Sequence, residues 1–166
     1  GSGYDPEGEF WLQEKSTNIG NMPAVLETLT AGSLCNDSNL HAPNSLNDGN
    51  IHWSITGDPT EAALITATIK AGISQKSVNY ERLDSIPFQS EYQYMATLNV
   101  RDNQPIIFLK GSLESLLPRC VSMLNKSGNP QEMDRTPIEQ QAEQMAARGL
   151  RELAFARKRV AIDVDE

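Results

Sequence analysis

Three short segments place polar or aromatic side chains at the ends of apolar stretches, where a ligand could reach them. They are residues 57–64, 87–95 and 110–114. Phe88 offers an aromatic face, and stacking on such a face is worth about 1–3 kcal/mol per base. Lys110 can border the base as a cation, and Gly111 lets a ligand approach the backbone closely. Together these groups suit a purine nucleotide.

Glu61 and Phe88 each allow two interpretations. Glu61 follows Asp58-Pro59-Thr60, which is the pattern of a helix start with a reciprocating Glu, and such a cap is worth about 0.5–2 kcal/mol. Glu61 could instead contact the base, if its carboxylate turns away from the cap. Phe88 follows Pro87 at the end of an expected strand, where an aromatic side chain either packs in the core or stacks on a ligand.

The charge of the chain is unevenly distributed. Fourteen Lys and Arg against 22 Asp and Glu give a formal net charge of -8, so we expect neither nucleic acid nor an anionic membrane surface as a partner. Yet five of the fourteen basic residues fall within twelve positions: Arg148, Arg151, Arg157, Lys158 and Arg159. This cluster favours a phosphate contact for Arg151, whereas we assign the last three residues to a solvated strand face.

Other chemistries have little support. The chain contains no GxxxxGK[ST], GxGxxG or GxSxG motif. His41 and His52 have no acidic or thiol cluster at ligand spacing around them, so we predict no metal site. Cys35 and Cys120 lack CxxC spacing and are expected to be reduced, buried thiols.

The periodicity of the apolar residues predicts the elements that position these groups. Helices are expected at residues 23–34, 58–72, 113–124 (bent at Pro118) and 136–149, the last starting from a Thr136 cap. Extended segments are expected at residues 10–13, 51–55, 80–88, 92–100, 105–109 and 151–160, with a loop at 36–50. The short connections favour antiparallel neighbours. The predicted fold class is therefore α+β, with a mainly antiparallel twisted sheet flanked by helices.

The order of these segments along the chain and the amino-acid sequence of each resemble the nucleotide-binding domain of P-type cation-transporting ATPases over nearly the whole chain. Residues 110–114 are similar to the family's KGAPE motif, which forms part of the adenine pocket. The Pro87-Phe88 segment resembles the stretch whose Phe stacks on adenine. Residues 57–64 resemble a segment whose Glu contacts the base, which implies that role for Glu61.

A fourth segment resembles the part of the family that contacts the phosphates. At two places in the pocket, the chain differs from the family's usual sequence. Residues 148–154 resemble the family's Gly-Leu-Arg-x-Leu-Ala stretch, which implies that Arg151 reaches the nucleotide phosphates. Gln93 stands where many members have a Lys, which removes one cationic contact, and Ser112-Leu113 replace the usual Ala-Pro of KGAPE. Residues 88–97 are similar to prokaryotic pumps of the type II branch, which includes calcium-pump-like members.

The resemblance implies that residues 1–166 are a single cytosolic nucleotide-binding domain of a larger pump in the cell membrane, with residues 1–3 an expression scar or the end of a linker. It implies ATP as the ligand and Mg²⁺ arriving with the nucleotide. The implied partners are the phosphorylation, actuator and transmembrane domains, and this chain itself is expected to make no membrane contact. The family's phosphorylated Asp-Lys-Thr-Gly-Thr segment does not occur here, so we predict no catalytic residue and no ATP turnover by this chain alone.

Two alternatives remain open from the sequence. One is a nucleotide-independent interaction module that packs against other domains through Trp11, Trp53 and the basic C-terminal strand. The weaker one is a phosphatase that uses Asp163 and Asp165, since these follow an apolar stretch as in haloacid-dehalogenase-type enzymes.

Overall fold

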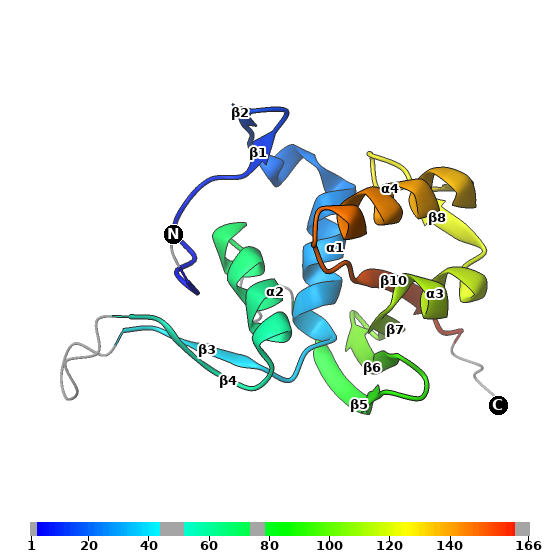
Figure 1. The fold of residues 1–166 in the computed structure, drawn as a ribbon. Coiled ribbons are helices and arrows are strands. Elements are labelled where there is room, and N and C mark those ends of the chain that lie inside the picture. The colour runs from blue at the N-terminus through cyan, green and yellow to red at the C-terminus, as the bar shows by residue number, and fades with distance from the viewer. Residues whose placement is uncertain (1–2, 44–51, 74–78, 162–166) are drawn as a thin grey trace.

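A four-stranded antiparallel sheet organises the chain in a computed structural model that describes residues 3–43, 52–73 and 79–161. The strand order is β10-β7-β6-β5. The bounds are β5 (Glu81–Gln89), β6 (Tyr94–Arg101), β7 (Gln104–Gly111) and β10 (Ala154–Arg159). Helices lie beside this sheet, as Figure 1 shows, so the expected α+β class with an antiparallel sheet is confirmed.

Helix α1 (Pro23–Leu34) lies between the sheet and helix α2 (Pro59–Lys70), because it packs on β7 and β10 as well as on α2 (Figure 1). The buried cluster between α1 and the sheet consists of Ala31, Leu34, Cys35, Met95, Ile106 and Phe108. Cys35 is fully buried, as expected, whereas Cys120 is only half-buried, and both thiols are free.

Successive side chains of a strand point to opposite faces of the sheet, so every second residue of β6 and β7 faces α1. Thr97 and Asn99 of β6 are each 1% exposed on this face, and Phe108 of β7 is fully buried. Lys110 follows Phe108 by two positions and therefore points to the same side. A charged residue is thus directed into the helix-covered side of the sheet.

The helix expected at residues 113–124 is wrong beyond its first turns. Helix α3 (Leu113–Leu116) tightens into the 3-10 turn η2 (Leu117–Arg119), and residues 122–124 form strand β8, paired with β9 (Pro130–Glu132). Pro118 cannot donate the hydrogen bond that would continue the α-helix. The apolar spacing alone did not reveal this break, and Val121, which lies within the predicted helix, is 93% exposed.

Short hairpins occur where the sequence predicted a single extended segment and a loop. The segment at residues 10–13 turns back at Gln13 and Glu14 (φ 49° and 63°), so β1 (Trp11–Leu12) pairs with β2 (Lys15–Ser16) before the turn η1 (Ile19–Asn21). The loop expected at 36–50 contains β3 (Asn39–His41), which pairs with β4 (Ser54–Thr56). Of the strand expected at 51–55, Ile51 lies outside the described residues.

Helix α4 (Arg135–Ala147) begins earlier than expected, because Asp134 rather than Thr136 is its N-cap. The described residues contain no group of three or more His, Cys, Asp or Glu side chains that could hold a metal ion, and both His41 and His52 are exposed. Across the same ranges, no helix combines the length and apolar character needed to cross a bilayer.

Candidate functional site

The residues singled out from the sequence meet at one end of the four-stranded sheet. Strand β5 ends at Gln89 and β7 ends at Gly111, while β6 begins at Tyr94 opposite Gly111. Strand β10 also begins here, since Ala154 pairs with Gly111. Phe88, Gln93, Lys110, Gly111 and Arg151 therefore all lie on or beside this end, and Glu61 joins them through Lys110.

Phe88 lies in a β-bulge of β5, a strand whose residues are all exposed. Ile86 pairs with Ala96 and Gln89 with Tyr94, so Pro87 and Phe88 together stand opposite the single residue Met95. The Phe88 residue is 56% exposed, which excludes the buried-core interpretation. Met95 pairs on its other side with Lys110. The exposed ring and the lysine thus occupy one row across the sheet, two strand spacings or about 10 Å apart.

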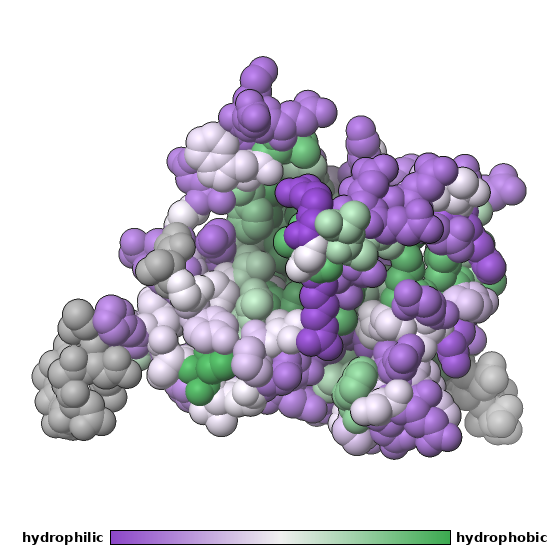
Figure 2. Space-filling view, viewed as in Figure 1, coloured by the Kyte–Doolittle hydropathy of each residue, from purple (hydrophilic) through white to green (hydrophobic). Residues whose placement is uncertain are grey.

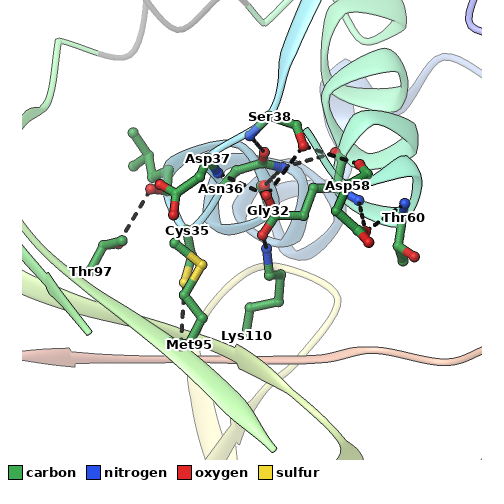
Figure 3. Close-up of polar contacts among 12 residues, drawn as sticks. Gly32, Cys35, Asn36, Asp37, Ser38, Asp58, Thr60, Met95, Thr97 and Lys110 are labelled. Carbon is green, nitrogen blue, oxygen red and sulfur yellow. Dashed lines mark hydrogen bonds and ion pairs between the residues drawn. The ribbon is translucent and has the colours of Figure 1, made fainter. Parts of the chain in front are cut away.

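Glu61 turns its carboxylate away from the helix cap. Asp58 caps α2 by itself, accepting hydrogen bonds from the backbone N–H groups of Thr60 and Glu61. The Glu61 Oε1 atom instead accepts from Lys110 Nζ at 2.5 Å. Figure 3 shows Lys110 reaching from the sheet toward the segment where the ends of α1 and α2 meet.

Lys110 is less accessible than a residue at the rim of a pocket would be. It is 5% exposed, because it lies on the face of β7 that α1 covers. Burial of an ammonium group is tolerated when an opposite charge and hydrogen bonds compensate for the lost water. Glu61 provides that partner, so a ligand would meet the lysine as one half of an ion pair.

Gly111 is required by packing within the protein. A Cβ atom there would overlap the carbonyl oxygen of Gln93 and would lie 2.9 Å from Leu116 Cδ1. Gln93 itself has a left-handed backbone (φ 57°), and both its carbonyl and its side-chain oxygen accept hydrogen bonds from Ser112, at 3.0 and 3.1 Å. The turn between β5 and β6 is therefore held against the end of β7.

Arg151 lies beside the N-terminal end of α2. Its Nη1 atom donates to Thr60 Oγ1 at 3.4 Å, and the side chain is exposed. The pKa of Asp58 is lowered here, first by the hydrogen bond from the Glu61 backbone and to a smaller extent by the charge of Arg151. The Asp58 carboxylate already caps this helix end, so the guanidinium of Arg151, rather than the helix dipole, is what this surface offers to an anion.

The sequence interpretation missed the residues that hold Glu61 in place. Asp37 N and Ser38 Oγ both donate to Glu61 Oε2, at 2.9 and 3.3 Å. Arg82 on β5 binds Asp37 in turn. Asn36-Asp37-Ser38 was visible as a polar stretch at the end of an apolar helix, but it indicated only where the helix stops. Nothing in the strand pattern distinguished Arg82 from a solvated residue.

The family model described as "P-type ATPase, cytoplasmic domain N" matches residues 24–164. The chain belongs to this family. This N domain is 48% identical over 167 residues to "Cation-transporting ATPase pma1" of Synechocystis sp., a match that covers 96% of this chain and 18% of that protein.

Further relatives carry calcium in their names. The N domain is 35% identical over 122 residues to "Calcium-transporting ATPase" of Bacillus subtilis, which covers 72% of this chain and 13% of that protein. It is 30% identical over 162 residues to "Calcium-transporting ATPase type 2C member 1" of Homo sapiens, a match that covers 94% of this chain and 16% of that protein. The chain thus spans less than a fifth of the length of these relatives. The resemblance to P-type cation-transporting ATPases is confirmed.

Proposed function

We propose that this N domain binds the adenosine of ATP at the end of the sheet where β5, β6 and β7 meet. The base stacks on Phe88 and lies beside the Glu61–Lys110 pair, while Gln93 and Gly111 form the corner next to it. Arg151 faces the phosphates. The parent protein would be a cation-transporting pump in the cell membrane, and this domain would be its cytosolic ATP-binding part.

The observation that carries the proposal is the exposed ring of Phe88 in the β-bulge. Phe88 is 56% exposed, two strands away from the buried Lys110–Glu61 pair, and its ring stacks on no other aromatic ring among the described residues. Exposing such a ring costs free energy that stacking on a base recovers. Membership of the N domain family supports adenosine as the base-bearing ligand.

The reaction is completed outside this chain. Bound ATP would present its γ-phosphate to an aspartate in the neighbouring domain, in an in-line transfer that depends on positioning and on charge neutralisation. The described residues offer no cluster of carboxylates that fits Mg²⁺. The metal is therefore expected to arrive with the nucleotide, and this chain contributes no step through it.

Gln93 should make the affinity modest. A neutral amide replaces the cation of many family members, and the site is open on one side. We expect a Kd for ATP of about 0.1 mM to several mM, equivalent to about 3–5.5 kcal/mol.

Paired substitutions on β5 test the proposal. Phe88→Ala should remove most of the binding heat in an ATP titration, because the stacking surface is lost. Leu83→Ala is the matched control, since Leu83 lies on the same strand and is 54% exposed, close to the 56% of Phe88. Equal ATP affinity in the two variants would contradict the assignment.

One observation favours the nucleotide-independent interaction module. Trp11 and Leu12 are 65% and 52% exposed on the β1–β2 hairpin, so Trp11 is not a core residue. Backbone amide shifts on adding ATP distinguish the two functions. Changes clustered at Phe88, Gln93 and Lys110 favour ATP binding, whereas their absence together with partner-induced changes at Trp11 favours the module. Asp163 and Asp165, on which the phosphatase alternative depends, lie outside the described residues.

A further inference from the structure

Arg82 joins strand β5 to the C-terminal end of α1. Its Nη2 atom donates to the carbonyl oxygens of Leu34 and Asn36, each at 2.7 Å, and Nη1 donates to Asp37 Oδ1 at 2.6 Å. The last carbonyls of a helix lack partners within the helix and attract a cation. The planar guanidinium thus fixes residues 36–38, which we call the clasp segment.

The other side of the clasp segment holds the start of α2. Asn36 Nδ2 donates to the carbonyl oxygen of Glu61 at 2.9 Å, and Ser38 Oγ donates to that of Asp58 at 3.1 Å. Asp37 N donates to Glu61 Oε2, and the single hydroxyl proton of Ser38 is shared between the Asp58 carbonyl oxygen and Glu61 Oε2. Asn36 and Ser38 are 4% and 2% exposed, so the bonds of their side chains are partly shielded from water, whereas the bond from Asp37 N is exposed. Figure 3 shows the clasp segment lying between α2 and the sheet, on the side to which Lys110 points.

The two oxygens of Glu61 therefore have different tasks. The clasp segment holds Oε2, and this leaves Oε1 directed at Lys110. The clasp segment also borders a polar hollow of about 350 Å³, which Asp37, Ser38 and Arg82 help to line.

We propose that Arg82 is a positioning residue for the nucleotide site, acting through the clasp segment on Glu61 and hence on Lys110. This inference rests on the proposed function. Arg82 and Phe88 are six residues apart on one strand, or about 20 Å, so Arg82 does not touch the base. It affects ATP affinity only through the geometry of the Glu61–Lys110 pair.

A double-substitution cycle in the whole chain tests the proposal. ATP affinity is measured for the wild type, Arg82→Gln, Glu61→Gln and the double variant. Arg157→Gln is the matched control, because Arg157 also bridges the sheet to α1, through Glu27 at 2.5 Å. Its side chain is 27% exposed against 33% for Arg82, but among the described residues its hydrogen bond and ion pair go to Glu27 and not to Glu61 or the clasp segment.

We expect Arg82→Gln to weaken ATP binding about 3- to 10-fold and Arg157→Gln to change it less than about twofold. In the Glu61→Gln background, the Arg82 substitution should change affinity less than about twofold, since the group it positions has been altered. Arg82→Lys keeps the positive charge but loses the planar guanidinium with its several donors, so this variant should keep more of the ATP affinity than Arg82→Gln. It takes the place of Arg82→Gln in the cycle if Arg82→Gln does not fold.

The ligand-free domain supplies a second readout. The Lys110 side-chain NMR resonances should shift in Arg82→Gln and stay in place in Arg157→Gln, because only the first alters the ion pair. Equal effects of the two arginine substitutions, or an undiminished Arg82 effect without the Glu61 carboxylate, would overturn the proposal. If the wild type binds no ATP, the proposed function fails, whereas the Lys110 resonances still decide whether Arg82 positions the pair.

Discussion

At the scale of single residues, burial controls the chemistry of the two cysteines. The Cys35 thiol lies in the core and donates toward the carbonyl oxygens of Met95 and Phe108, at 3.4 and 3.7 Å. Burial raises its pKa to about 11, although the charge of Lys110 opposes this. Partial burial also raises the pKa of Cys120. Because the thiolate is the reactive form, Cys35 should be the less reactive of the two thiols.

Alkylation should separate the two thiols. At pH 8 a thiol with a pKa of about 11 is thiolate in only about one molecule in a thousand, and Cys35 is also inaccessible. Iodoacetamide should therefore modify Cys120 first, and Cys35 only when urea unfolds the chain. Mass spectrometry of the digested protein gives both rates. Modification of Cys35 in the native protein at the rate of Cys120 would show that the core opens readily.

The sequence was informative about single residues where the local chain decides their surroundings. The position of Phe88 after Pro87 at a strand end left open whether the ring packs in the core or stacks on a ligand, and the structure decides against the core because Phe88 is 56% exposed. The orientation of Glu61 could not be predicted, because its partners Asp37 and Lys110 are 24 and 49 residues away. The capping pattern therefore indicated the helix start correctly but left the direction of the carboxylate open.

At the scale of elements, the start of α2 links stability to the site. Asp58 accepts from two backbone N–H groups, at 2.8 and 3.1 Å, and Glu61 carries the second of them. Asp134 caps α4 through a bond to Thr136 N at 3.1 Å. Asp58→Ala and Asp134→Ala should each lower the free energy of unfolding by about 1 kcal/mol. Only Asp58→Ala should also weaken ATP binding, since it loosens the turn that carries Glu61.

The pH dependence of the Asp58 cap follows from its pKa. The carboxyl has a pKa below its ordinary value of 3.8 in the folded state. A depressed pKa stabilises the fold above the unfolded value, and this contribution is lost as the pH falls through the folded one. The stability difference between wild type and Asp58→Ala should thus be complete at pH 7 and shrink below about pH 4. Urea unfolding of both proteins at pH 7 and below about pH 4 measures this difference in the free energy of unfolding. A difference that stays the same at the lower pH would exclude a charged cap.

The helices and strands also show where the spacing of apolar residues predicts secondary structure correctly and where it does not. Helices α1, α2 and α4 lie within a few residues of their predicted bounds, because proline and capping residues mark their starts. The hairpins β1–β2, β3–β4 and β8–β9 have strands of two or three residues, too short to show an alternation. The helix expected at 113–124 failed because Pro118 removes a donor that apolar spacing does not register.

At the scale of the whole molecule, the net charge of the chain and the local charge of Arg151 would act in opposite directions on the phosphates of a nucleotide. Figure 2 shows hydrophobic surface set back along α1, between the more polar surfaces of α2 and α4. The chain as a whole carries a formal charge of -8. Under the proposed function, the general field would repel the triphosphate, while Arg151 at the start of α2 would attract it locally. These two effects oppose each other, so the base should dominate the affinity.

This balance predicts that the number of phosphates matters little. AMP, ADP and ATP should bind with Kd values within about fivefold of one another, whereas GTP should bind distinctly more weakly, because the contacts proposed for Phe88 and Glu61 are with the base. Salt should change the ATP affinity only slightly, since screening at about 10 Å weakens the repulsion and the Arg151 attraction together. Calorimetry with the four nucleotides at 50 and 300 mM salt tests both statements. Equal affinity for GTP and ATP, or an ATP affinity that falls steeply with salt, would place the decisive contacts at the phosphates instead.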